Sequence, residues 1–159
     1  MHDADDPHHR HALKARAAKR DAAHGAGVDD AYVASFVDRF YGKIREDELL
    51  GPIFNERIED WPTHLATMKR FWRSVLHNSG EYSGNPMRKH VAIPGIGEEH
   101  FAHWLTLFYQ TLREEQPSDA ATQNVGGTAR NIADSLLTGI AMRRDGLMGT
   151  RAGDNLPRV

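Results

Sequence analysis

Histidines and aromatic residues with polar tips are the side chains of this sequence that could carry chemistry. Tyr41, His64 and Trp104 each fall on an apolar helical stripe, so each would bring a hydrogen-bonding group into an apolar interior. Taken singly, each could have its polar tip satisfied locally. The three together favour a lined pocket. His90 stands apart, on a short segment between two prolines. There it is either a structural residue or, if it faces a flat apolar cofactor, an axial metal ligand.

The other histidine groups give weaker signals for a metal site. His8, His9 and His11 could bind Ni²⁺ or Zn²⁺, but a solvated polar tail is the simpler interpretation. His100 and His103 are three residues apart and would form half a metal site, yet no HExxH motif and no third clustered ligand accompanies them. We therefore expect ordinary polar residues at both places.

Composition excludes several classes of function. The 159 residues include 20 Lys and Arg, 22 Asp and Glu and no Cys, with a formal net charge of −2. Without a basic field we expect no binding to nucleic acid or to an anionic membrane. Without cysteine there is no disulfide, no thiolate metal site and no Cys nucleophile. Because no apolar run reaches about 18 residues and the N-terminus lacks a secretory signal, we expect a cytoplasmic protein.

Familiar enzyme motifs are also missing from the sequence. Gly95-Ile96-Gly97 is followed by two glutamates and a histidine where a dinucleotide-binding loop needs a third glycine, and there is no Gly-Lys-Ser/Thr phosphate loop. No glutamate has a histidine three residues later, which argues against a di-iron carboxylate site in a helical bundle.

Apolar residues recur at helical spacing along the chain and predict an all-α fold of four main helices with short additional ones. No alternating strand or hairpin turn interrupts them. The first predicted helix is capped by Asp29 or Asp30, and the chain breaks at 51–52. A second helix starts at 60–62 and stops at 78–80, and a short helix follows at 86–91. The next helix ends before Pro117, and the last one begins at 118–119.

The distribution of polar residues predicts one folded unit with two extensions. Residues 1–28 contain few large apolar side chains and are expected to be mobile or loosely helical. Residues 29–143 form the folded domain. Residues 144–159 are Gly-rich and polar and are expected to be a flexible tail.

Four ordered stretches point to a known family: FYGKIREDELLGPIFN (40–55), WPTHLATMKRFW (61–72), YSGNPMRKH (82–90) and HFAHWLTLF (100–108). Over about residues 32–140 they resemble the group III truncated haemoglobins in content, order and spacing. The resemblance implies a truncated globin, a two-over-two helical sandwich around a b-type haem (iron protoporphyrin IX). Without cysteine the haem cannot be attached covalently and must be held by its histidine ligand and by burial.

The resemblance also implies roles for individual residues. His90 matches the proximal ligand, so it should bind iron through Nε2 while its other ring nitrogen donates to a backbone carbonyl or nearby acceptor. Tyr41 matches the distal hydroxyl and Trp104 the distal indole donor. His64 occupies the distal gate position, where it either lines the pocket or swings outward. Phe54 matches the phenylalanine that packs on the haem face.

Further cofactor-binding residues follow from the resemblance, from the helical stripes and from their closeness to matched positions. The expected pocket walls are Phe40, Met68, Phe71, Trp72, Met87 and Ile93. For most of these an ordinary core role is the alternative. Arg88 and Lys89 flank the ligand and could pair with haem propionates, although a solvated face is the commoner fate of such charges.

The function implied is binding of O₂, NO and CO, with the polar distal residues Tyr41, His64 and Trp104 supporting redox chemistry. That chemistry is either NO dioxygenation to nitrate or cleavage of peroxide, supplied with electrons by an unidentified reductase. The alternative is a protein that binds, stores or senses O₂ or NO without turnover. A helical bundle that binds no haem is the third possibility.

Overall fold

The computed structural model describes residues 7–25, 27–115, 118–146 and 152–159. These ranges contain no strand, and none of their helices is long and apolar enough to cross a membrane. The all-α prediction is confirmed. The helices are α1 (Pro7–Gly25), α2 (Asp30–Glu46), α3 (Gly51–Arg57), α4 (Trp61–His77), α5 (Pro86–Val91), α6 (Glu98–Glu115) and α7 (Asp119–Asp145).

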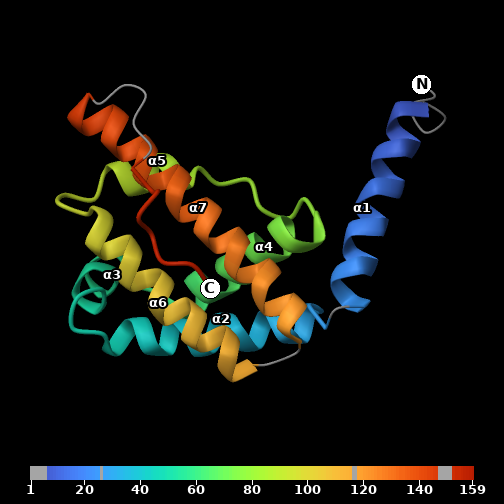
Figure 1. Ribbon diagram of the computed structural model, residues 1–159, viewed down its shortest axis with the longest axis horizontal. Helices are drawn as coiled ribbons and strands as arrows, with labels where there is room; N and C mark the ends of the chain where they lie inside the picture. The colour runs from blue at the N-terminus through green and yellow to red at the C-terminus, as the bar shows by residue number, and fades with distance from the viewer. Residues whose placement is uncertain (1–6, 26, 116–117, 147–151) are drawn as a thin grey trace.

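The long helices α2, α4, α6 and α7 form two pairs (Figure 1). Helix α2 packs on α4, α6 packs on α7, and the pairs meet where α2 contacts α6. This is the expected two-over-two sandwich. The short helix α5 contacts α7, and the short helix α3 contacts α2. Each short helix therefore packs on a different one of the two pairs.

Side-chain caps fix the starts of most of these helices. A side-chain oxygen accepts a hydrogen bond from the backbone N–H three residues later at Asp29 for α2, Asp60 for α4, Asn85 for α5 and Ser118 for α7. Such bonds satisfy N–H groups that have no partner inside the helix. At the other end of α4, Asn78 takes a left-handed conformation with φ 55°. The boundaries predicted at these positions are confirmed.

Aromatic rings fill the space between the two helix pairs. Phe36 and Phe108 are fully buried, and Phe108 stacks on Trp72 with ring centroids 5.1 Å apart. Phe36 meets Trp72 and Phe108 edge on, at 5.5 and 5.6 Å. Each large ring removes roughly 150–250 Å² of mostly apolar surface from water. This cluster therefore fixes how α2, α4 and α6 lie relative to one another.

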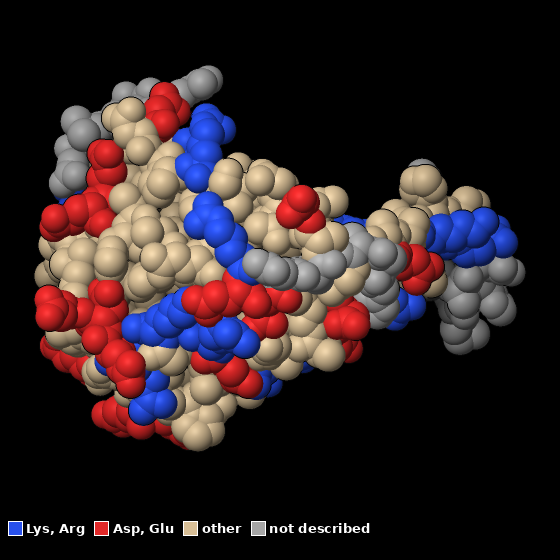
Figure 2. All heavy atoms as spheres, turned by 60° about the horizontal axis from the view of Figure 1, so that its bottom comes forward, with Lys and Arg blue, Asp and Glu red and all other residues tan. Residues whose placement is uncertain are grey.

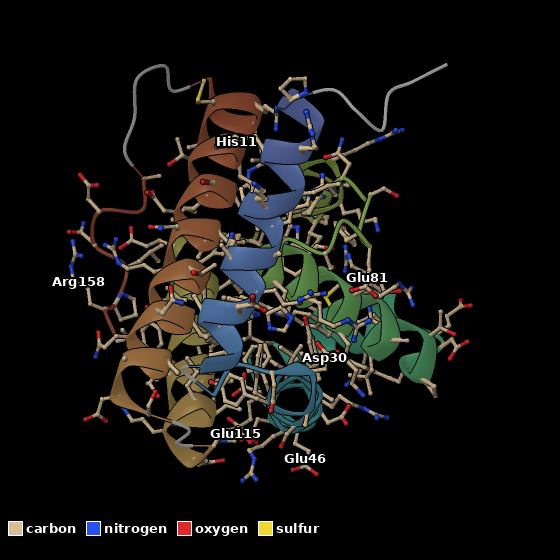
Figure 3. All side chains as sticks on the ribbon, turned by 90° about the vertical axis from the view of Figure 1, so that its right-hand side faces the viewer. His11, Asp30, Glu46, Glu81, Glu115 and Arg158 are labelled. Carbon is tan, nitrogen blue, oxygen red and sulfur yellow. The ribbon has the colours of Figure 1, made fainter. Side chains whose placement is uncertain are left out.

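Helix α1 contacts α4, and its N-terminal end projects away from the sandwich (Figures 1 and 2). Its described side chains are exposed over 10–22 except the half-buried Ala17, and Ala23 near its end is buried. Residues 7–25 are thus helical, and the mobility expected for this extension stays a prediction. His11 is exposed (Figure 3), whereas the side chains of His8 and His9 lie outside the described part of the chain. Acidic and basic side chains are interleaved on the face of Figure 2.

The described end of the chain, residues 152–159, packs on α6 and α7, and the flexibility predicted for the tail over 144–159 stays a prediction. Leu156 is buried, and the Tyr109 hydroxyl donates to the carbonyl oxygen of Pro157 at 2.7 Å. The Arg130 guanidinium donates to three carbonyl groups of the segment 152–159. Leu156 and Val159 supply apolar side chains that pack on the protein. Arg130 and Tyr109 donate hydrogen bonds to the backbone carbonyl groups of the same segment.

Candidate functional site

His90 lies on α5 with one ring nitrogen engaged. Its Nδ1 is 2.6 Å from the carbonyl oxygen of Pro86, four residues earlier, so Nδ1 carries the proton and donates it. The neutral ring then keeps its lone pair on Nε2, the form of imidazole that binds a metal ion. Burial lowers the pKa of His90, the Pro86 bond works against this shift, and the charge of Lys89 adds to it. The neutral form is therefore favoured.

The surroundings of His90 come from α6 and α7. The Phe101 ring on α6 lies beside the imidazole, with centroids 6.3 Å apart and planes at 33°. Met87 points to α7, where a Cβ added at Gly139 would lie 2.3 Å from the Met87 Cε atom. The glycine thus makes room for the methionine, and α5 is seated closely on α7. The close packing of α5 on α7 fixes the position of the His90 backbone.

A second cluster gathers Tyr41 from α2, Phe54 from α3 and His64 from α4. The Tyr41 and His64 rings meet edge to face at 5.3 Å, and Phe54 lies 6.0 Å from Tyr41. Trp61 covers this cluster, 5.7 Å from His64, and is itself covered by the Arg45 guanidinium 4.6 Å above its ring. The sequence-predicted residues Tyr41, His64 and Phe54 are therefore brought together.

The polar groups of this cluster lie in apolar surroundings. The Nε2 atom of His64 is one of two buried side-chain atoms in the described residues without a hydrogen-bond partner, the other being the Tyr32 hydroxyl. Burial and then the charge of Lys89 lower the pKa of His64, and burial raises the pKa of Tyr41, so both side chains are neutral near pH 7. A buried polar atom without a protein partner is a candidate contact for a ligand.

Trp104 reaches the same cluster through Phe40. The Phe40 ring meets Tyr41 at 5.1 Å and Trp104 at 5.4 Å, both edge on, and Trp104 stacks on Phe108. Trp104 and Phe101 are three residues apart on α6 and so share one face of that helix. One face of α6 thus carries both the aromatic neighbour of His90 and the indole of the Tyr41 cluster.

The remaining predicted cofactor residues differ in their burial and in the residues that they contact. Trp72 is buried in the core, stacked on Phe108. Partly buried side chains that pack on this core are Met68, Phe71 and Ile93. Arg88 and Lys89 are exposed, and the positive charge of Lys89 lies close enough to lower the pKa of both His64 and His90.

Some contributors to the site escaped the sequence analysis. Phe101 stands one turn before Trp104 on the same stripe, and that spacing could have identified it as a neighbour of the site. The Arg45 contact with Trp61 has no local signal, because the two residues belong to separate helices.

The paired histidines of α6 both make hydrogen bonds within the protein. His100 Nδ1 accepts a hydrogen bond from the backbone N–H of Gly97 at 3.1 Å, and His103 Nε2 lies 2.6 Å from Asp47. In the part of the chain that the structure describes, no group of three or more His, Asp or Glu side chains could hold a metal ion.

Comparisons with known proteins agree with this arrangement. Residues 25–137 match the family described as bacterial-like globin. The chain is 38% identical over 89 residues to a group 3 truncated haemoglobin of Campylobacter jejuni, a match that covers 54% of this chain and 70% of that protein. The fold matches a crystal structure of group III truncated haemoglobin from Campylobacter jejuni with a TM-score of 0.67, 32% identity, and coverage of 70% of this chain and 91% of that chain.

A two-over-two helical sandwich with these matches is a truncated globin fold. The chain belongs to the bacterial-like globin family and is similar within it to the group III truncated haemoglobins. It is accordingly a haem-binding globin whose ligands are diatomic gases such as O₂.

Proposed function

We propose that this globin holds a b-type haem through Nε2 of His90 and takes up O₂ and NO on a polar distal side formed by Tyr41, His64 and Trp104. The observation that carries the proposal is the 2.6 Å contact from His90 Nδ1 to the Pro86 carbonyl oxygen, which puts the proton on Nδ1 and leaves the lone pair of Nε2 able to bind a metal ion. The bound haem supplies the coordination site for a diatomic ligand and the redox chemistry.

The residues of this chain fit such a group. The buried Nε2 of His64 lacks a protein partner, and Phe54 and Phe101 offer apolar rings beside Tyr41 and His90, respectively. Arg88 and Lys89 are exposed next to His90, where they can pair with the haem propionates.

The distal residues favour retention of a polarised ligand. The raised pKa of Tyr41 keeps its hydroxyl protonated as a donor, and the Trp104 indole is a donor only. A hydrogen bond to a charged partner is worth roughly 1.5–3 kcal/mol, so each donor can slow ligand escape by about tenfold or more. Slow release suits a protein that converts its ligand better than one that delivers it.

The reaction that we propose is NO dioxygenation, in which NO, O₂ and one electron give nitrate, or peroxide cleavage at the same pocket. A reductase supplies the electrons. The distal donors act on the oxygen atoms of the ligand in both reactions, which is the role of pre-oriented hydrogen bonds at a developing charge. Non-enzymatic binding, storage or sensing is the alternative function.

Absorbance spectra of haem-reconstituted protein test the cofactor assignment. We expect one haem per chain, a CO complex typical of histidine ligation, and loss or marked change of both in His90→Ala. Spectra of His90→Ala that match the wild type would show that His90 is not the ligand.

Turnover distinguishes the two functions. Repeated conversion of NO to nitrate in the presence of a reductase, or oxidation of a peroxidase substrate well above the rate of free haemin, supports the enzyme. Stoichiometric binding without turnover would instead establish a store or sensor.

A further inference from the structure

His103 and Asp47 join two parts of the chain that carry distal residues. The His103 Nε2 atom on α6 lies 2.6 Å from Oδ1 of Asp47, the residue that directly follows α2. The side chain of Asp47 is 15% exposed and that of His103 is 37% exposed. The pair is therefore partly shielded from water, and its hydrogen bond is screened less than that of a fully exposed ion pair.

Asp47 also fixes the corner between α2 and α3. Its second carboxylate oxygen accepts the backbone N–H groups of Leu49 and Leu50 at 3.1 and 2.9 Å. Burial works to raise the pKa of Asp47, but hydrogen bonds from His103 and these two backbone groups lower it below its ordinary value. The carboxylate stays ionised and holds three donors at once, six residues after Tyr41 on the same chain segment.

His103 directly precedes Trp104 on α6. At the other end of α6, Arg39 and Lys43 of α2 pair with Glu114 and Glu115. Helices α2 and α6 are thus joined by polar contacts near both ends of α6. The contact next to Trp104 is the one made by His103.

We propose that the hydrogen bond from His103 to Asp47 positions Trp104 in the ligand pocket. The bond holds the N-terminal half of α6 against the corner between α2 and α3, close in sequence to Tyr41. This inference rests on the proposed function, since it assigns the bond to the distal pocket. His103 is then a positioning residue, because it acts through its neighbour and does not touch the ligand.

Substitutions of His103 test the proposal, because Asp47 must remain to hold its backbone partners. His103→Leu removes the donor and keeps much of the volume, whereas His103→Gln retains an N–H donor near the position of Nε2. Arg39→Gln is the matched control, since it cuts a contact between the same helices at the far end of α6.

Two readouts follow the indole without relying on turnover. The first is the ¹H–¹⁵N resonance of the Trp104 indole in the haem-free chain. The second is the C–O stretching band of the haem-reconstituted CO complex, which responds to hydrogen-bond donors beside the ligand. O₂ dissociation measured by rapid mixing completes the set.

We expect His103→Leu to shift the indole resonance and the C–O band and to speed O₂ dissociation by about fivefold, because a weakened donor loses part of its bond. His103→Gln should restore all three, and Arg39→Gln should leave them at wild-type values. Wild-type values in His103→Leu, or equal shifts in Arg39→Gln, would overturn the positioning role while leaving the proposed function intact. A wild-type chain that takes up no haem would overturn both.

Discussion

The rings of Tyr41 and His64 meet edge to face, with centroids 5.3 Å apart and planes at 88°. Because Tyr41 belongs to α2 and His64 to α4, this contact sets polar groups of two helices against each other in apolar surroundings. Burial shifts the pKa of each toward its neutral form, upward for Tyr41 and downward for His64. The pair therefore places a hydroxyl donor and an uncharged imidazole side by side in one apolar cluster.

Replacing Tyr41 by phenylalanine removes the proposed distal hydroxyl while keeping the ring. We expect Tyr41→Phe to speed O₂ dissociation by about tenfold or more, the loss of one hydrogen bond to a charged partner. Stopped-flow displacement of O₂ by CO measures this rate. Tyr109→Phe, which removes a hydroxyl bonded to the end of the chain, is the control and should keep the wild-type rate. An unchanged rate in Tyr41→Phe would assign the stabilisation to Trp104 alone.

The lowered pKa of His64 predicts that acid destabilises the fold. The ordinary imidazole pKa is 6.5, and burial and then Lys89 move that of His64 below it in the folded chain. The unfolded chain therefore binds the proton more tightly, and the free energy of unfolding falls as the pH drops below 6.5 through the folded-state pKa. His64→Leu should flatten this dependence.

Urea denaturation of the haem-free protein at several values between pH about 7.5 and about 5 measures the effect. His11→Leu, at an exposed position on α1, is the control and should keep the wild-type slope. A slope in His64→Leu as steep as that of the wild type would contradict the prediction.

Gly51 permits the close approach of α3 to the end of α2. A Cβ at this position would lie 3.0 Å from the carbonyl oxygen of Arg45 and 3.2 Å from that of Ile44. Backbone oxygens cannot turn away as a side chain can, so Gly51→Ala should lower the free energy of unfolding by about 1–3 kcal/mol. Gly42→Ala is the matched control on α2, because its Cβ would meet no atom within 4 Å. It should stabilise by about 0.5–1 kcal/mol, and similar effects of the two changes would refute the steric argument.

The packed end of the chain should contribute to stability but not to haem uptake. Removing residues 152–159 exposes the surface beneath Leu156, whose burial is worth about 1.5–3 kcal/mol. We expect a lower denaturation midpoint with haem uptake still at one per chain. Gly126→Ala should act in the same direction, since its Cβ would lie 2.8 Å from the Val159 side chain. A truncated chain as stable as the full one would contradict this prediction and support a flexible tail.

Local signals in the sequence predicted the starts of α2, α4, α5 and α7, whereas the break predicted at 51–52 is the first turn of α3. Asp29, Asp60 and Ser118 were visible as caps because the capping partner lies only three residues away. The short helix at 86–91 was bounded correctly by its flanking prolines and glycines. The resemblance of four stretches to the group III truncated haemoglobins indicated the family from the sequence alone.

Contacts between distant segments were not predictable in this way. Asp47 and His103 are 56 positions apart in the sequence, and nothing in the sequence around either residue indicates that the two form a hydrogen bond. The glycines and polar residues of 144–159 predict a flexible tail, and nothing in that composition indicates that Leu156 and Val159 pack on the protein. The prediction that Met87 lines the haem pocket stays untested. Its orientation toward Gly139 depends on how α5 packs on α7, which no local pattern in the sequence indicates.

The bond between His90 and Pro86 lies within a single helix of six residues. The imidazole is consequently held in one orientation by its own helix. In the proposed ligation by His90, haem uptake then costs little of the rotational freedom that an unanchored ring would lose. The ring and its carbonyl acceptor also move together when α5 shifts on α7. The basicity of Nε2 therefore depends on contacts inside α5, and the position of the imidazole in the fold depends on how α5 packs on α7. These two properties can be tuned by separate sets of substitutions.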